Sequence, residues 1–198
     1  MACWISSLTV RQMSKLLSRE FFASNTLAVA RALLGAEIIY RGCAGRIVET
    51  EAYRDDPASH AVTRPNKGRM LFDTYGHVYI YLIYGMYHCL NFTTERDGVG
   101  AVLIRAVEPT SGIAEMQRRR QTNPPRNLTN GPGKLFQAFG FDPAHHGELI
   151  GTTILVRPAP SNNASLDIVQ SPRIGISRAT QLPWRFCIKD SPFLSKPA

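Results

Sequence analysis

Val48-Glu49-Thr50-Glu51-Ala52-Tyr53 ends an apolar run of β-forming residues that starts at Ile38, and it decides the predicted fold. Because side chains alternate between the two faces of a strand, Glu49, Glu51 and Tyr53 project to the same side. The two carboxylates are then about 7 Å apart. Burying such a pair is costly unless each carboxylate has a partner or a task. The stretch therefore predicts either a salt-bridged edge strand or a strand that holds a water molecule under a flat, stacked substrate.

Further β-type segments lie on both sides of this strand. We expect strands over residues 37–40, 45–53, 77–84, 87–93 and 99–107, joined by short turns. The first two are close enough to form a hairpin across residues 41–44. Gly85 at the first turn position suits a two-residue type II′ turn, which places Tyr84 at the tip of a second hairpin. Together these segments predict an antiparallel meander.

The rest of the chain predicts helices and short strands. Asn25 is a suitable N-cap for a helix that ends at Gly35. We expect helices over residues 26–34, 112–121 and 134–139, and short strands over 153–157, 174–176 and 185–188. Residues 54–74 lack periodicity and are expected to be irregular, and such a long segment inside a compact domain is usually functional or disordered. We expect residues 1–17 to form a loosely packed arm, and residues 18–198 to form a single mixed α+β domain.

The composition limits the classes of partner and the cellular compartment. Of 198 residues, 44% are hydrophobic and 19% charged, which favours a buried core and argues against disorder. The net charge of +8 suits an anionic partner, either nucleic acid or an acidic membrane surface. No run of about 18 apolar residues predicts a membrane span. The four cysteines are far apart, so we expect free thiols in a reducing compartment, the cytoplasm.

The carboxylates and tyrosines are candidates for chemistry. A carboxylate held beside water in a partly dry site can act as a general base, and Glu51 shares its strand face with the Tyr53 ring. We expect an arginine to neutralise Glu49, because two unpaired buried carboxylates repel each other. The tyrosines around residue 81 suit either base stacking or cross-strand core packing. Tyr84 at a hairpin tip could enter a groove and wedge between base steps.

Other polar residues are candidates for binding. His60 lies in the irregular segment and could contact the same pocket, although a lone histidine often has a structural role. Asn91 and Arg105 interrupt strands that otherwise look buried, and buried polar groups need partners. Arg64, Lys67, Arg126 and Lys134 could contact phosphates. No His, Cys or Asp spacing suits a metal site, and His145-His146 is expected to be an exposed turn.

Seven stretches, in order between about residues 18 and 195, share the pattern of one known family. They are Ile47-Val48-Glu49-Thr50-Glu51-Ala52-Tyr53, Asp55-Asp56-Pro57-Ala58-Ser59-His60, Tyr79-Ile80-Tyr81-Leu82-Ile83-Tyr84-Gly85-Met86-Tyr87, Cys89-Leu90-Asn91, Val102-Leu103-Ile104-Arg105-Ala106-Val107-Glu108-Pro109, Leu128-Thr129-Asn130-Gly131-Pro132-Gly133-Lys134-Leu135 and Arg173-Ile174-Gly175-Ile176. After the last come Pro183-Trp184-Arg185-Phe186 and Ser191-Pro192-Phe193. The chain resembles the alkyladenine (3-methyladenine) DNA glycosylases, as a bacterial-type single-domain member.

The resemblance implies a fold and an activity. The fold is one compact mixed α+β domain with a curved, mostly antiparallel sheet and a protruding β-hairpin. The implied enzyme is a monofunctional DNA N-glycosylase of base-excision repair, which flips a damaged purine out of double-stranded DNA and hydrolyses its N-glycosidic bond. It implies no cofactor, no catalytic metal and no membrane partner. We expect a monomer in the cytoplasm, associated with a bacterial nucleoid.

The resemblance also implies roles for single residues. Glu51 matches the general base that activates water. Tyr53, His60 and Tyr81 match the pocket that sandwiches the flipped base, and Tyr84 matches the residue that fills the vacated gap. Asn91 matches a residue that screens the pocket against wrong purines, and Arg105 matches one near the water and the flanking phosphate.

Two other functions fit parts of the sequence. A non-catalytic nucleic-acid-binding module of the same fold is one, and the presence of Glu51 counts against it. A nucleoside hydrolase using the same carboxylates is the other, and the net charge of +8 counts against it.

Overall fold

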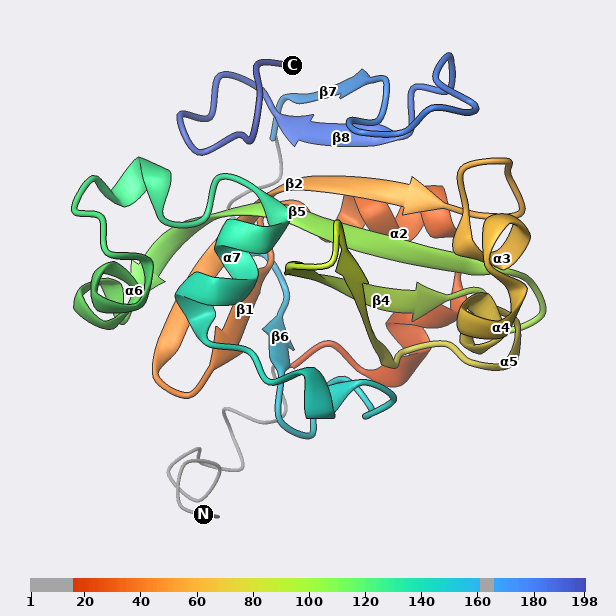
Figure 1. Ribbon diagram of the computed structural model, residues 1–198, viewed down its shortest axis with the longest axis horizontal. Helices are drawn as coiled ribbons and strands as arrows, with labels where there is room; N and C mark the ends of the chain where they lie inside the picture. Colours follow the sequence, from red (N-terminus) through yellow and green to blue (C-terminus); the bar gives the residue numbers. More distant parts are fainter. Residues whose placement is uncertain (1–15, 161–165) are drawn as a thin grey trace.

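The computed structural model describes residues 16–160 and 166–198 (Figure 1). Nearly all of the expected arm over residues 1–17 lies outside the described residues. At its end, the Leu17 N–H donates to the Val156 carbonyl at 2.8 Å. The described residues form a mixed α+β fold around an eight-stranded sheet, as the sequence predicts.

Antiparallel strands make up the sheet. Their bounds are β1 (Glu37–Tyr40), β2 (Cys43–Tyr53), β3 (Val78–Ile83), β4 (Tyr87–Thr94), β5 (Gly100–Ser111), β6 (Leu155–Arg157), β7 (Ile168–Ser171) and β8 (Arg185–Ile188). The main order is β3-β4-β5-β2-β1-β6, with β8 between β2 and β7. Every pairing is antiparallel.

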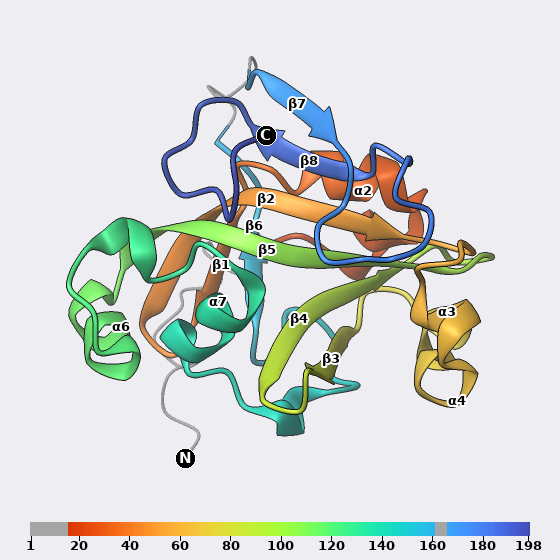
Figure 2. The ribbon, with the colours of Figure 1, turned by 45° about the horizontal axis from the view of Figure 1, so that its top comes forward.

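Strand β2 is the centre of this sheet. One of its edges pairs with β5 along most of its length. Its other edge pairs first with β1, up to Arg46, and then with β8, from Glu49 to Glu51. Register shifts in the β2–β5 ladder flank Glu49, and such bulges bend a strand. Figure 2 shows the bent sheet and the separate positions of β1 and β8 along β2.

Helices pack on both faces of the sheet. The α-helices are α2 (Thr26–Ala32), α3 (His60–Thr63), α4 (Pro65–Gly68), α5 (Met70–Asp73), α6 (Ile113–Arg120) and α7 (Pro132–Phe139), and the 3₁₀ helices are η2 (Arg19–Ala23), η3 (Pro125–Asn127) and η4 (Pro143–His145). Asn25 caps α2, as predicted, by accepting from the Leu27 and Ala28 N–H groups. Helices α2 and α7 lie on opposite sides of β5 (Figures 1 and 2).

The contact between α2 and β2 fixes the orientation of the carboxylates. The Thr50 hydroxyl donates to the Ala30 carbonyl at 2.9 Å, so Thr50 faces α2. Neighbouring side chains on a strand point the other way. Glu49 and Glu51 therefore project to the side away from α2, and both contact Arg105 there.

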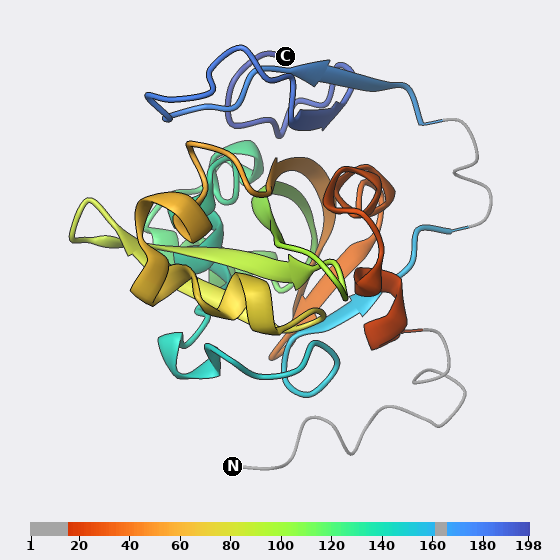
Figure 3. The ribbon, with the colours of Figure 1, turned by 90° about the vertical axis from the view of Figure 1, so that its right-hand side faces the viewer.

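The two hairpin tips differ from the predicted turns. Tyr40 pairs with Cys43, so the first turn contains only Arg41 and Gly42, both at positive φ, and β2 starts two residues earlier than expected. Ile83 pairs with Tyr87, so the second tip has three residues rather than the two of a type II′ turn. Tyr84 takes a φ of 52° there. Figure 3 shows this tip, in yellow-green, projecting beyond the rest of the molecule.

Other expectations are corrected by the structure. Residues 54–74 contain the short helices α3, α4 and α5 rather than irregular chain only. Residues 174–176 form a loop, and the missed strand β7 lies just before it. His145 is buried, not exposed, because its ring lies between the Tyr40 hydroxyl and the Glu148 carboxylate, both at 3.0 Å.

Candidate active site

Glu51 is fully buried near the C-terminal end of β2 and has three donors. Its Oε1 accepts the Ile174 N–H at 2.7 Å and lies 3.3 Å from Nη1 of Arg105. Its Oε2 accepts the Tyr53 hydroxyl at 2.8 Å. Tyr53, Arg105 and Ile174 all line a cavity, so Glu51 sits directly behind the cavity wall.

The surroundings of Glu51 make it a stronger base than an exposed carboxylate. Burial raises its pKa, because a carboxylate removed from water is harder to ionise. Arg105, the Ile174 N–H and the Tyr53 hydroxyl oppose this rise, and Glu49 adds to it. Burial and the Glu51 charge raise the pKa of Tyr53 well above its ordinary value, so the phenol stays protonated and its O–H donates a hydrogen bond to Glu51.

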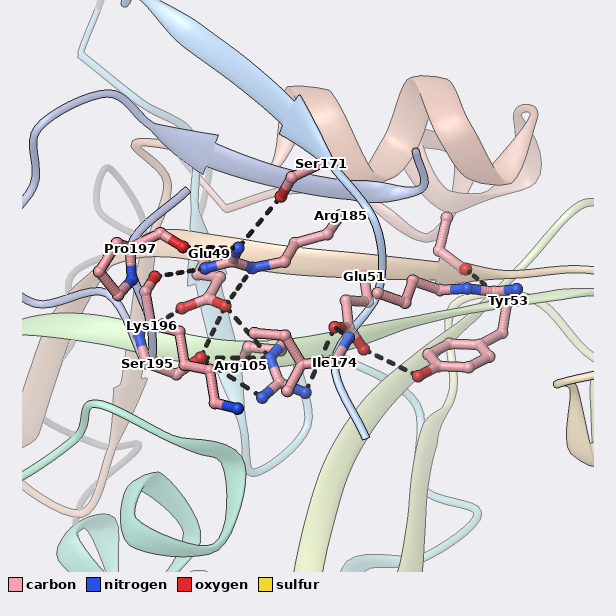
Figure 4. A network of polar contacts seen from close by, with 12 residues as sticks. Glu49, Glu51, Tyr53, Arg105, Ser171, Ile174, Arg185, Ser195, Lys196 and Pro197 are labelled. Atoms are coloured by element: carbon pink, nitrogen blue, oxygen red, sulfur yellow. Dashed lines mark hydrogen bonds and ion pairs between the residues drawn. The ribbon is translucent and has the colours of Figure 1, made fainter. Parts of the chain in front are cut away.

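Glu49 is neutralised, as the sequence predicts, and by more groups than one arginine. Its Oε1 accepts Nε of Arg185 at 2.7 Å and Nε of Arg105 at 3.2 Å. Ser195 adds its backbone N–H and its hydroxyl. In Figure 4 the Arg105 guanidinium lies between the two carboxylates and contacts both. The sequence predicts no role for Arg185 or Ser195, because both residues lie far from Glu49 along the chain.

An aromatic cavity of about 370 Å³ adjoins Glu51. The predicted pocket residues Tyr53, His60 and Tyr81 all line it, together with Tyr79. The His60 and Tyr81 ring centroids are 4.4 Å apart in an edge-to-face arrangement. Electron-rich aromatic walls suit a flat ring and, above all, a cationic one. The cavity thus has the lining that a stacked heterocycle needs.

His60 is held in the cavity wall by a hydrogen bond. Its Nδ1 lies 2.8 Å from the Tyr79 hydroxyl. Burial, followed by the charges of Arg64 and Lys67, lowers the pKa of His60 to about 4. The ring is therefore neutral near physiological pH and does not add a positive charge beside a bound base. The helix α3, which starts at His60 and is capped by the Ser59 hydroxyl, fixes its position.

Asn91, Arg64 and Tyr84 also line the cavity. The Asn91 amide donates to the Tyr79 and Cys89 carbonyls, so the β3–β4 hairpin fixes its orientation. Tyr84 is 73% exposed, the highest value among the large hydrophobic side chains of the described residues. Among the aromatic residues that line the cavity, Tyr84 is the one with an exposed side chain, at the cavity mouth.

Two arginines near the cavity are absent from the sequence prediction. Arg178 is exposed and lines the cavity. Arg173 is buried behind the Tyr53 ring, with its Cζ 4.6 Å from the ring centroid, and it pairs with Asp56. The sequence signal for Arg173 is the family-like Arg-Ile-Gly-Ile stretch, but the sequence predicts only a strand over residues 174–176 and no role for Arg173 itself.

The remaining cations proposed for phosphate contacts lie on the surface. Lys67, Arg126 and Lys134 are exposed, and they belong to α4, η3 and α7. Lys134 donates to Asn130 at 2.9 Å. Pro132 lines the cavity, so the start of α7 lies near its mouth. The structure thus brings Glu51, Tyr53, His60, Tyr81, Tyr84, Asn91, Arg64 and Arg105 together, whereas Lys67, Arg126 and Lys134 lie outside the cavity lining.

Within residues 16–160 and 166–198, no three His, Cys, Asp or Glu side chains are arranged to hold a metal ion. In the same part of the chain, no helix is long and apolar enough to cross a membrane. Cys43, Cys89 and Cys187 are buried free thiols, as predicted, whereas Cys3 lies outside the described residues.

Comparison with known proteins identifies the family. The sequence pattern of the methylpurine-DNA glycosylase (MPG) family matches residues 20–192. Proteins provisionally named 3-methyladenine DNA glycosylase are similar to this chain in Rhodopseudomonas palustris (43% identity, 93% of this chain and 90% of the relative), Nitrosospira multiformis (44%, 89% and 92%) and Rhizobium etli (47%, 90% and 88%).

The aromatic cavity beside a buried carboxylate and this family match place the chain among the DNA N-glycosylases, enzymes that repair alkylated bases. The chain belongs to the methylpurine-DNA glycosylase family.

Proposed function

We propose that this protein removes alkylated purines, 3-methyladenine first among them, from double-stranded DNA, by hydrolysing the N-glycosidic bond with a water molecule that Glu51 activates. The observation that carries the proposal is the position of Glu51. It is a fully buried carboxylate held by Tyr53, Ile174 and Arg105, all of which line the aromatic cavity. Relatives at 43–47% identity carry the name of this activity.

Binding requires the damaged nucleotide to leave the DNA stack. Flipping costs a few kcal/mol, and a damaged or mismatched base costs least. Tyr53, His60 and Tyr81 would enclose the flipped base, and alkylation at a ring nitrogen makes that base cationic, which favours contact with the tyrosine faces. Tyr84 would fill the gap left in the duplex. Asn91, held rigidly by two backbone carbonyls, would exclude purines of the wrong shape.

The chemical step needs one ionised carboxylate. Glu51 would take a proton from water while the water oxygen bonds to C1′ of the sugar. The C1′–N bond breaks, and its electron pair leaves with the base, which loses its positive charge. No general acid is required for a cationic base. Until it takes the proton, the Glu51 carboxylate also provides negative charge near the oxocarbenium-like sugar, which stabilises the transition state.

The basic surface would hold the DNA backbone. Arg64, Lys67, Arg126 and Lys134 are exposed and would contact phosphates, which gives sequence-independent and salt-sensitive affinity. We propose that the enzyme acts as a monomer, without a metal or cofactor, on the DNA of the bacterial nucleoid in the cytoplasm.

Release of free base tests this function. With a duplex that contains 3-methyladenine, we expect free 3-methyladenine and an intact strand with an abasic site, measured by chromatography of the base and by alkaline cleavage of the strand. An undamaged duplex of the same sequence should release none. Binding without release would support the non-catalytic module instead, and release from free nucleosides but not from duplex DNA would support a nucleoside hydrolase.

A further inference from the structure

The segment 195–197 is tied to the carboxylate pair by a set of hydrogen bonds. The Ser195 N–H donates to Oε2 of Glu49 at 2.6 Å, and the Ser195 hydroxyl donates to Oε1 at 2.7 Å. Nε and Nη2 of Arg105 donate to the same hydroxyl at 3.4 and 3.3 Å. Arg185 donates to the Lys196 and Pro197 carbonyls. The segment therefore contacts Glu49 and both of its arginines (Figure 4).

Arg105 is shared between two buried carboxylates that would otherwise compete for it. Its Nε is 3.2 Å from Glu49 and its Nη1 is 3.3 Å from Glu51. Glu49 has further donors in Arg185 and Ser195, so it does not depend on Arg105 alone. Hydrogen bonds to a buried charge are strong, and an unsatisfied carboxylate draws any nearby cation. Donors that satisfy Glu49 thus leave Arg105 available to Glu51.

We propose that Ser195 and Glu49 are positioning residues, which together set how the Arg105 guanidinium is shared between Glu49 and the catalytic carboxylate Glu51. This inference rests on the proposed role of Glu51 as the base. Neither residue touches the cavity; each acts through Arg105, which lines it. Segment 195–197 is then part of the catalytic apparatus although it is distant in sequence from β2 and β5.

The sharing of Arg105 between Glu49 and Glu51 affects the pH dependence of the reaction. The titratable and charged groups around Glu51 are Glu49 and Tyr53 of β2, Tyr81 of β3, Cys89 of β4, Arg105 of β5 and Cys187 of β8. Burial keeps the tyrosines and cysteines protonated, since it raises the pKa of Tyr53 and Tyr81 well above the ordinary value, that of Cys89 to about 11 and that of Cys187 to about 12. These tyrosines and cysteines therefore add no charge beside Glu51 near neutral pH, and the remaining charged groups are those of the ion-pair network, Glu49, Arg105 and Arg185.

The direction of each change in the pKa of Glu51 depends on how strongly Arg105 interacts with Glu49 rather than with Glu51. Loss of the Ser195 hydroxyl leaves Glu49 less satisfied, so Glu49 draws Arg105 and the pKa of Glu51 rises. Loss of the Glu49 charge removes a like charge and frees Arg105, so the pKa of Glu51 falls. Because the base must be ionised, activity on the acid side follows this pKa. Ser195→Ala should move the acid limb to higher pH, and Glu49→Gln should move it to lower pH.

The test is the pH profile of the single-turnover excision of 7-methylguanine from duplex DNA. This base is cationic in the DNA, so it needs no protonation to leave. We expect opposite displacements of the acid limb in Ser195→Ala and Glu49→Gln, each on the order of half a pH unit. The double variant should shift in the same direction as Glu49→Gln, because without the Glu49 charge the loss of the Ser195 hydroxyl no longer draws Arg105 away from Glu51. Ser191→Ala is the matched control. Its hydroxyl accepts from the Phe193 N–H, not from this network, and the profile should not move.

The outcomes separate this inference from the proposed function. If the wild-type protein releases no base, the proposed function fails. If the wild-type releases base and Glu51→Gln does not, but all the acid limbs coincide, the role of Ser195 and Glu49 is wrong. Displacement of both acid limbs in the same direction would also overturn the role of Ser195 and Glu49. A general loosening of the fold could cause such parallel shifts, whereas it cannot cause opposite ones. Thermal unfolding of each variant shows that the compared proteins are folded.

Discussion

Glu51→Gln should slow the excision of 3-methyladenine about a thousandfold, within the range of roughly 10²–10⁴ that a positioned general base contributes. Glutamine has the same shape as glutamate and can still accept the Ile174 N–H, but it cannot take a proton from water. Arg105 keeps Glu49 as a partner, so no buried charge is left alone. The measurement is the single-turnover rate at saturating enzyme, with the affinity for the same duplex measured separately.

A matched substitution separates the loss of the base from a general loss of negative charge. Glu108 lies on the same strand as Arg105 and pairs at the surface with Arg46. Glu108→Gln should excise at the wild-type rate, because an exposed pair contributes little. Equal rates for Glu51→Gln and the wild-type would show that another group activates the water.

Tyr84→Ala is expected to lower the rate of excision about 10- to 100-fold, because the stacking of a base on an aromatic ring contributes ~1–3 kcal/mol. The side chain is the most exposed large hydrophobic group of the described residues and stands at the cavity mouth. Alanine keeps a β-carbon, so the backbone at φ 52° is as strained as before and the hairpin tip is retained. The measurement is a flipping-sensitive fluorescent base beside the lesion, together with the excision rate.

Tyr84→Phe is the control for the wedge. Phenylalanine keeps the ring that would fill the gap in the duplex, so flipping and excision should remain within about twofold of wild-type. If Tyr84→Ala flips the base as readily as the wild-type protein, the ring is not a wedge. A fall in Tyr84→Phe as large as that in Tyr84→Ala would assign the effect to the hydroxyl instead.

The sequence predicts the centre of the sheet well because long strands leave a clear pattern. Residues 45–53 form a β-type stretch that contains Glu49 and Glu51, and the observed β2 starts only two residues earlier. The alternation of side chains along a strand predicts that Glu49 and Glu51 share a side, and their common contact with Arg105 confirms it. Glu49 was expected to be paired with an arginine, and two arginines hold it.

Shorter elements escape prediction for physical reasons. Helices α3, α4 and α5 have four residues each, too few for a 3.6-residue period to show. Ile174 lies in an apolar triplet typical of a strand, but its N–H donates to Glu51 rather than to a neighbouring strand. That contact turns the segment into a loop of the site. Ser195 has no local sequence feature at all, because its importance arises only from a contact across 146 positions.

The most direct test of the proposed mechanism is a structure of the protein bound to duplex DNA that carries a cationic pyrrolidine abasic analogue. We expect the analogue to lie in the cavity lined by Tyr53, His60 and Tyr81, with a water molecule between its ring and Glu51. We also expect the Tyr84 ring in the gap of the duplex. An analogue that stays stacked in the helix, or enters the cavity with no water at Glu51, would contradict the proposed mechanism.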